Sequence, residues 1–464
     1  MNDTTKAINT KQAETAKGSD QPRLALFRDT NFRWMISGGV ISMLGDQFTI
    51  VALPWLVLKM TGDTLILGLV LALIGVPRAL LILLGGAVVD RYSPKQVMML
   101  SKYVNTVVLG LLSALLMSDQ LSLNMVYVLA LSLGISTAFS IPSGTAMIPR
   151  CIAAPQLQMA NGIMLGLRQI SMFLGPLLAG ILIAVFGNTA TDMTDAAGLA
   201  DARGLAAAFL FDSFSYALSA WTLSHVRMLA LPQLELAGHG KNAHPKPAAR
   251  LWHSILEGLR YCWNDVMLRT CFLYWSAVAF FIMGPIQIAL PVLANQLGDS
   301  ASTFGILIGC HGAGTLLGML MSGLLPNRRL VNLGRTILLI DFIVGLLFIP
   351  MSLVVTTWQA AALLLSIGTL GGYLHVAVYT WIQRQVPAAM LGRSMSIFMF
   401  IFMGIGPVSA AITGWAMRSI STAQLFIGSG ALLILIVLLA FLGSEMPSVK
   451  DQVVVDQAAQ DPAA

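Results

Sequence analysis

The chain has 464 residues, of which 56% are hydrophobic and only 10% are charged, and its formal net charge is +6. A soluble chain of this length would form two or three domains with charged surfaces, and soluble domains contain about 25% charged residues. The shortage of charge, with a mean hydropathy of +0.79, excludes an ordinary soluble protein and predicts a membrane protein.

Apolar runs long enough to cross a bilayer recur along the chain, and a helix needs about 20 such residues to cross. Backbone polar groups must be satisfied inside lipid, so these runs are predicted to be helices and the fold to be all-α. The twelve predicted spans are 33–58, 65–89, 96–117, 122–148, 158–187, 203–226, 267–296, 302–325, 333–353, 357–384, 391–417 and 422–443.

The basic residues predict how these spans are oriented, because Lys and Arg concentrate in cytoplasmic loops. With a cytoplasmic N-terminus, most of the 27 Lys and Arg residues fall on the cytoplasmic side, including Lys102 after the second span. Only Lys59, Arg203 and Arg418 fall outside, and Arg78 and Arg168 fall within spans. Both termini are therefore predicted to be cytoplasmic, and the positive charge is read as a topology signal and not as a nucleic-acid surface.

The chain divides into two groups of six spans. Residues 1–32 are predicted to be a cytoplasmic tail without a signal peptide, and residues 444–464 a second tail. The halves at 33–226 and 267–443 are joined by a linker at 227–266. Its later part has apolar residues at helical spacing (Leu251, Ile255, Leu259 and Trp263), which predicts an amphipathic helix on the membrane surface.

The second half echoes the first in two places. After the second span comes Gly86-x-x-x-Asp90-Arg91, and after the eighth comes Gly323-x-x-x-Asn327-Arg328. The fifth span contains Gly175 and Pro176, and the eleventh contains Gly406 and Pro407 at a nearly equal offset. Corresponding motifs in corresponding spans favour parallel repeats, that is, a pseudo-symmetric pair of six-helix halves.

With these motifs the sequence resembles the major facilitator superfamily. "GGAVVDRYSPKQVM" matches the signature after the second span, on Gly86, Asp90, Arg91 and Lys95, although Pro94 and Lys95 stand where many members have two basic residues. "STAFSIPSGTAMIPRCIAAPQLQMANGI", "IQRQVPAAMLGRSMSI" and "EGLRYCW" are similar to the branch of macrolide efflux proteins and the enterobactin exporter. The resemblance covers residues 24–443 and implies alternating access.

The resemblance gives the loop motifs a possible task. In the family, the acid after the second span pairs with basic groups and helix ends of neighbouring spans and latches the outward-facing state. The residues in the matching positions are Gly86, Asp90, Arg91 and Lys95 and, in the echo, Gly323, Asn327 and Arg328. The alternative is that these charges only anchor the helix end at the cytoplasmic face.

Ionisable residues inside spans are costly and are therefore candidates for transport. Asp46 lies near the middle of the first span, which in the family lines the central cavity, and is the leading candidate for a proton-binding acid. Arg78 and Arg168 could attract an anionic substrate or neutralise Asp46, and His375 could relay protons. Structural hydrogen bonding is the alternative for each of them, and it is favoured for Asp212 and Asp341.

Gly175 with Pro176, and Gly406 with Pro407, could bend their helices, as a glycine-rich motif does in exporters of the superfamily, or could simply allow close packing. No nucleotide-binding loop, catalytic triad or metal pattern is present in the sequence, so neither an enzyme nor a cofactor is expected.

The sequence therefore predicts a monomeric secondary transporter in the lipid bilayer of a bacterial inner membrane, with protons as coupling ion. Efflux of a small molecule such as a drug or secondary metabolite is the main hypothesis. Siderophore export and lysophospholipid transport are the alternatives, and a non-transporting sensor is the alternative from another class.

Overall fold

The computed structural model describes residues 26–187, 202–228, 247–298, 300–324 and 332–449. The predicted N-terminal tail up to residue 25, residues 229–246 of the predicted linker and the end of the chain beyond residue 449 lie outside these ranges. In the described part the chain is built from helices, as the hydropathy predicts.

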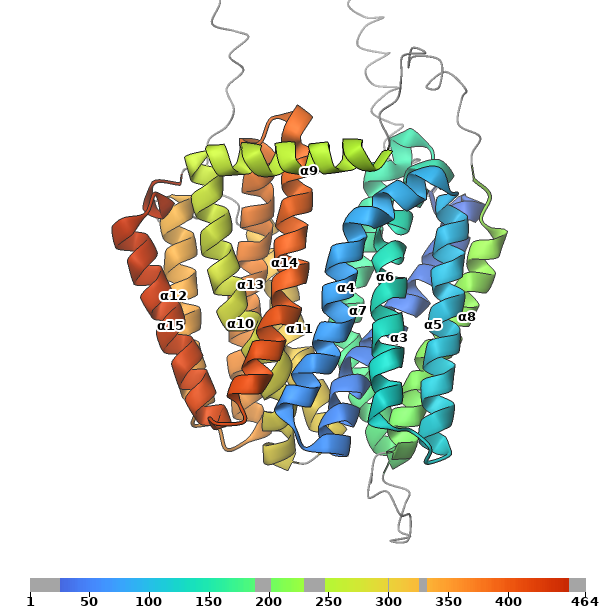
Figure 1. The fold of residues 1–464 in the computed structure, drawn as a ribbon, viewed down its shortest axis with the longest axis horizontal. Coiled ribbons are helices and arrows are strands. Elements are labelled where there is room, and N and C mark those ends of the chain that lie inside the picture. Colours follow the sequence, from blue (N-terminus) through green and yellow to red (C-terminus); the bar gives the residue numbers. More distant parts are fainter. Residues whose placement is uncertain (1–25, 188–201, 229–246, 299, 325–331, 450–464) are drawn as a thin grey trace, which may run out of the picture.

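Two groups of six long helices stand side by side in Figure 1. The helices of the first half are α3 (Thr30–Thr61), α4 (Thr64–Arg91), α5 (Pro94–Met117), α6 (Leu123–Cys151), α7 (Leu157–Gly187) and α8 (Ala202–His225). Those of the second half are α10 (Val266–Gly298), α11 (Ala301–Leu324), α12 (Leu333–Met351), α13 (Thr357–Gln385), α14 (Ala388–Ala416) and α15 (Thr422–Gly443). Two short 3₁₀ turns, Ala154–Gln156 and Met446–Ser448, complete the elements.

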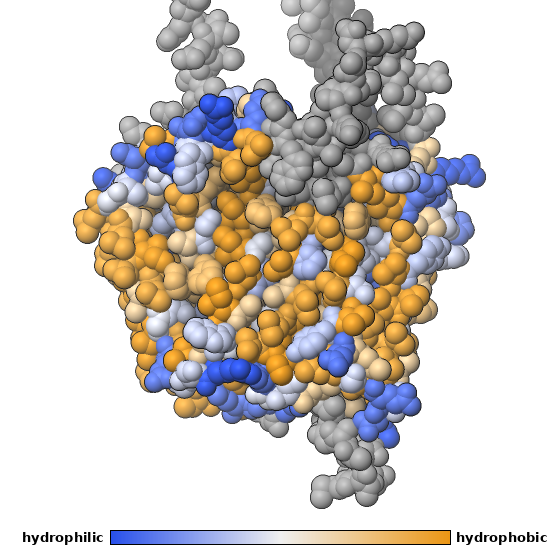
Figure 2. Space-filling view, viewed as in Figure 1, coloured by the Kyte–Doolittle hydropathy of each residue, from blue (hydrophilic) through white to orange (hydrophobic). Residues whose placement is uncertain are grey.

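Eleven helices in the described ranges are long and apolar enough to cross a membrane. The remaining predicted span is α8, whose 24 residues extend about 36 Å at 1.5 Å per residue, enough for a hydrocarbon core of about 30 Å. Buried serines and Asp212 make α8 less apolar than the others. Figure 2 shows an apolar band across the face in view, with hydrophilic residues gathered toward the two ends of the molecule.

Local sequence signals set the helix ends. The side chains of Asp29 and Asp63 accept hydrogen bonds from the first turns of α3 and α4, which satisfies backbone donors that the helix leaves unpaired. Gly62, with φ of 61°, makes the tight connection between these two helices. Ser421 and Gln424 form a reciprocal capping box at the start of α15.

Helix α9 (Pro247–Asn264) lies across one end of the bundle (Figure 1). An ion pair of 3.0 Å between Glu257 and Arg393 ties it to α14, and Gly258 packs against the side chain of Arg393. Leu256, Leu259 and Trp263 remain exposed. An apolar face left uncovered by protein is what an interfacial helix offers to the membrane surface.

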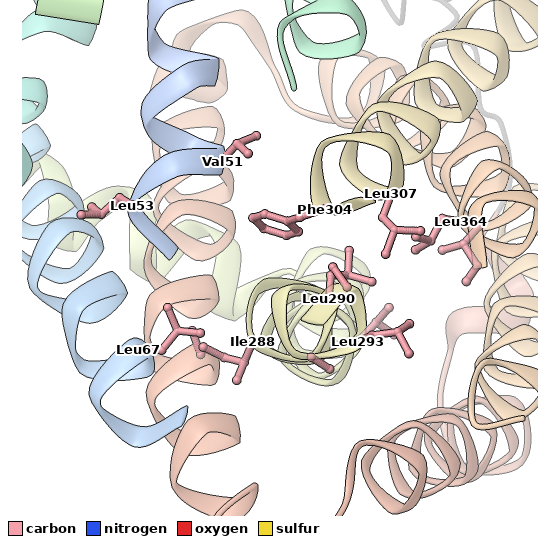
Figure 3. Packing of buried hydrophobic residues seen from close by; sticks show 14 of the residues in the cluster. Val51, Leu53, Leu67, Ile288, Leu290, Leu293, Phe304, Leu307 and Leu364 are labelled. Carbon is pink, nitrogen blue, oxygen red and sulfur yellow. The ribbon is translucent and has the colours of Figure 1, made fainter. Parts of the chain in front are cut away.

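The largest apolar cluster extends through both halves, and it joins them at the end of the bundle away from α9. Figure 3 shows Val51 of α3 and Leu67 of α4 facing Ile288 and Leu290 of α10, with Phe304 of α11 beside them. These side chains are almost fully buried, and the ring of Trp55 stacks on that of Phe304 with centroids 6.2 Å apart. Apolar burial of this kind between halves stabilises the closed contact at this end.

Candidate functional site

Asp46 lies in the middle of α3 and is held from α8. The hydroxyl of Tyr216 donates to its carboxylate at 2.5 Å. The two helices come this close because glycines face α8: a Cβ on Gly45 would lie 2.1 Å from the hydroxyl of Ser215, and one on Gly38 would lie 1.9 Å from that of Thr222. Small residues at a helix contact let polar side chains bridge two spans directly.

Lys102 belongs to this site: although it was counted with the cytoplasmic basic residues, it lies inside the predicted third span and is buried there. Helix α5 already begins at Pro94, so Lys102 lies two turns inside it, with only 5% of its surface exposed. Its ammonium donates to the hydroxyls of Ser219 at 2.6 Å and Ser42 at 3.4 Å, and it lies 5.5 Å from the centre of the Tyr216 ring. The sequence places it at the edge of a basic loop, which hid its burial.

Asp212 is one turn away from Tyr216 on α8 and is 1% exposed. It accepts a hydrogen bond of 2.5 Å from Thr49 of α3. Asp46 with Tyr216, and Thr49 with Asp212, therefore form two neighbouring crosslinks between the same pair of helices. Lys102 and Asp46 are close enough for their charges to act on Asp212.

The predicted arginines also act on Asp46. The charges of Arg168 on α7 and Arg78 on α4 act on Asp46, and that of Arg168 also acts on His375 of α13 in the second half. Arg168 and His375 are exposed. The Nε atom of Arg78 is buried and has no hydrogen-bond partner among the described residues. The structure thus brings the four predicted residues of the spans into one region between the halves.

The predicted latch is only partly described. Gly86, Asp90 and Arg91 lie in the last two turns of α4, but their side chains are outside the description. Lys95 donates from Nζ to the main-chain oxygens of Ser224 at 2.8 Å and Val226 at 2.7 Å, which ties the start of α5 to the end of α8 within the first half. A cation at this position also suits the negative end of the α8 dipole.

In the echo of this motif, Gly323 lies in the last turn of α11 with open space around it. Asn327 and Arg328 fall outside the described residues.

The glycine–proline motifs lie where the two halves touch. The main-chain oxygen of Pro176 on α7 lies 2.5 Å from where a Cβ on Gly305 of α11 would be, and the ring of Pro407 on α14 lies 1.9 Å from the Cβ position of Gly75 on α4. The neighbouring Gly175 and Gly406 face Gln47 of α3 and Gln287 of α10, each within its own half. Both motifs therefore occupy equivalent contacts between halves, α7 with α11 and α4 with α14.

An ion pair closes the end away from α9. Arg418, after α14, donates through its guanidinium to both carboxylate oxygens of Asp63, before α4. The hydrogen bonds from Arg418 hold the pKa of Asp63 below its usual range. Beside it, the hydroxyl of Thr64 donates to the carbonyl of Gly414 at 2.9 Å. In Figure 1 the ribbons of α4 and α14 meet at this end and separate toward α9.

Comparison with known families and proteins agrees with this arrangement. A model of the Major Facilitator Superfamily matches residues 35–411. The chain belongs to the major facilitator superfamily. It is accordingly a secondary transporter and not an enzyme.

The curated relatives of this superfamily chain include bacterial exporters. It is 25% identical over 417 residues to the "Enterobactin exporter EntS" of Salmonella choleraesuis (strain SC-B67), covering 89% of this chain and 92% of that protein. The protein of the same name from Shigella boydii serotype 4 (strain Sb227) is 26% identical over 365 residues, 78% of this chain and 79% of that protein.

Solved structures of other superfamily transporters have the same fold. The nucleoside transporter NupG matches with a TM-score of 0.66 at 12% identity, over 90% of this chain and 100% of that chain. A D-xylose-proton symporter matches with a TM-score of 0.65 at 13% identity, over 90% and 99%. The all-helical membrane fold and the resemblance to the exporter branch are confirmed by these matches.

Proposed function

We propose that this transporter exports a small molecule from the cytoplasm of a bacterium and is driven by protons entering the cell. The positive-inside pattern supports a cytoplasmic location for both termini and for the end with α9. On that orientation, the packed end with Asp63 and Arg418 faces outward and the conformation is inward-facing. Export as the direction is supported by the similarity to proteins named enterobactin exporters.

Asp46 is proposed as the proton-binding residue, and its position carries the proposal. Its carboxyl lies partly exposed in the middle of a span, is bonded to Tyr216 and is surrounded by the charges of Lys102, Arg168 and Arg78. An acid in such a place can gain and lose a proton as its access to water changes sides. A change in the charge of Asp46 would alter its interaction with Arg168, which also acts on His375 in the second half.

The substrate of this exporter is proposed to be a drug or a secondary metabolite. A siderophore is the second candidate, favoured by the name of the full-length relatives and by the two cations, Arg78 and Arg168, next to the junction of the halves. A guanidinium with an unused donor is suited to bind an anionic oxygen, and Nε of Arg78 is such a donor.

The substrate is tested in a strain that lacks its own exporters, with the protein supplied from a plasmid. Secretion of enterobactin, resistance to erythromycin and release of a lysophospholipid are measured in parallel. The substrate so found is then used in proteoliposomes, where addition of substrate should cause proton movement in the opposite direction. Absence of any proton movement during transport would exclude proton coupling.

The role of Asp46 is tested by Asp46→Asn, which keeps the size of the side chain and its bond to Tyr216. Proton-coupled export should be lost, while exchange of labelled for unlabelled substrate without a gradient should continue. Asp341→Asn is the matched control, because Asp341 also lies within a span and accepts a hydrogen bond of 2.7 Å from a tyrosine, Tyr274. If Asp46→Asn exports as well as the parent protein, Asp46 is not the proton site.

A further inference from the structure

Three helices of the first half enclose a set of polar groups that extends well behind Asp46. We define the α3–α5–α8 cluster by its members, which come from all three helices and hydrogen-bond or act electrostatically on one another. They are Ser42, Asp46, Thr49, Lys102, Asn105, Asp212, Ser215, Tyr216 and Ser219. Most of them are more than nine-tenths buried.

The ionisable groups of this cluster do not balance if all of them are charged. Two carboxyls, Asp46 and Asp212, act on each other, and one ammonium, Lys102, acts on both. Burying an uncompensated charge costs several kcal/mol, and two adjacent carboxylates disfavour ionisation of both. One bound proton makes the set of three neutral.

The surroundings of the two carboxyls indicate which of them holds this proton. Lys102 on α5, Arg168 on α7 and Arg78 on α4 all act on Asp46, so three cations favour its ionised form. The charged groups that act on Asp212 are Asp46 on α3 and Lys102 on α5, while Tyr216 stands one turn away on its own helix. Asp212 therefore has a neighbouring anion, a single cation and almost no exposed surface.

The hydrogen bonds around Asp212 fit a neutral carboxyl. Ser215 has a single hydroxyl hydrogen and lies 2.7 Å from the main-chain oxygen of Asp212 but 3.2 Å from its Oδ1. That hydrogen suits the nearer oxygen better, and a proton on Oδ1 would turn the longer contact into a full hydrogen bond to the Ser215 hydroxyl. Thr49 meanwhile donates to Oδ2.

A further polar side chain in the cluster has unused bonding capacity. Asn105 is 0% exposed, and neither its Nδ2 nor its Oδ1 has a hydrogen-bond partner of good geometry among the described residues. It lies beside Tyr216. A buried amide of this kind is suited to hold a water molecule, which would let protons exchange next to the tyrosine that bonds Asp46.

We propose that Asp212 stores a proton behind Asp46, and that Lys102 is the fixed cation that keeps the store at one proton. The two carboxyls then bind protons as a pair, since a proton arriving at Asp46 removes the negative charge that favours the one on Asp212. This inference rests on the proposed function only for the use of the stored proton in transport. Lys102 is a positioning residue and touches no substrate.

The store is tested without any substrate, by infrared spectroscopy of the full chain in liposomes at neutral pH. The C=O stretch of neutral carboxyl groups is compared between variants. Asp212→Asn should remove one neutral carboxyl. Lys102→Met should add one, because Asp46 then loses the cation that acts on it most strongly, whereas Lys102→Arg should leave the number unchanged. Asp341→Asn is the control, because Asp341 lies in the other half of the molecule. Adding Lys102→Met to Asp341→Asn should change the neutral-carboxyl signal as much as it does in the parent protein.

An unchanged neutral-carboxyl signal in a folded Asp212→Asn protein would overturn the proposal. Should that variant fail to fold, Lys102→Met decides, and the absence of an added neutral carboxyl refutes the store. The outcomes are separate from those for Asp46: loss of coupling in Asp46→Asn with no change in Asp212→Asn would leave the proposed function standing and this inference wrong. If the infrared spectra are as expected but Asp46→Asn still couples export to protons, this inference stands and the proposed role of Asp46 is wrong.

Discussion

The contact between Gly75 on α4 and Pro407 on α14 gives a sharp test of how the two halves rock. A methyl group at residue 75 would lie 1.9 Å from Cγ and 2.5 Å from Cβ of the proline ring. Carbon atoms pack at about 3.5–4.0 Å, so the two helices would have to part by about 1.5 Å. Gly75→Ala should therefore destabilise the conformation in which this end is closed.

The size of the effect follows from the cost of overpacking. Inserting a methylene-sized group into a close contact costs about 1–3 kcal/mol, which corresponds to about a 5- to 150-fold shift between two conformations. Alanine also raises helix propensity by about 1 kcal/mol over glycine, but that gain is the same in both conformations. Gly144→Ala in α6 is the control, since a Cβ there would meet nothing within 4 Å.

The shift is measured as a distance distribution between two spin labels after the native cysteines are replaced. Asp119, between α5 and α6, and Leu353, between α12 and α13, lie at the closed end in different halves. Gly75→Ala should enlarge the population with the longer distance between these labels, and Gly144→Ala should not. Equal distributions in the two variants would show that this contact does not hold the closed end.

Three further outcomes are expected. Arg418 lowers the pKa of Asp63, so the ion pair is intact at neutral pH and is lost as the pH falls through that lowered pKa. Acid should therefore open the labelled end in the parent protein. It should cause no further opening in Asp63→Asn, which lacks the ion pair at every pH. Lys95→Met should lower the free energy of unfolding by about 1 kcal/mol, as two partly exposed charged hydrogen bonds are lost; a thermal shift assay measures it. Asp90→Asn should impair transport far more than Asn327→Ala, because only Asp90 carries charge, and equal losses would contradict a lopsided latch.

The sequence predicted the helices because each span follows from its own composition. Apolar length sets where a helix can cross, and backbone satisfaction in lipid leaves no alternative to a helix. Charges inside such runs are conspicuous, so Asp46, Arg78 and Arg168 could be selected before any contact was known. The echo of Gly175 and Pro176 in Gly406 and Pro407 likewise pointed to equivalent positions in the two halves.

The sequence did not predict the partners of these residues, because the partners depend on how the helices pack. In the sequence, Lys102 looks like one more basic residue near a cytoplasmic loop. It is buried because α5 starts two turns before it and packs against α3 and α8. Tyr216 and Asp212 meet α3 because Gly45 lets α8 approach closely.

Hydropathy is a property of one helix at a time, so the sequence by itself determined the spans and the presence of costly charges within them. Which charges neutralise each other depends on which helix faces lie together. That is decided by side-chain contacts between residues more than 100 positions apart, such as Asp46 and Tyr216, and these exist only in the tertiary structure.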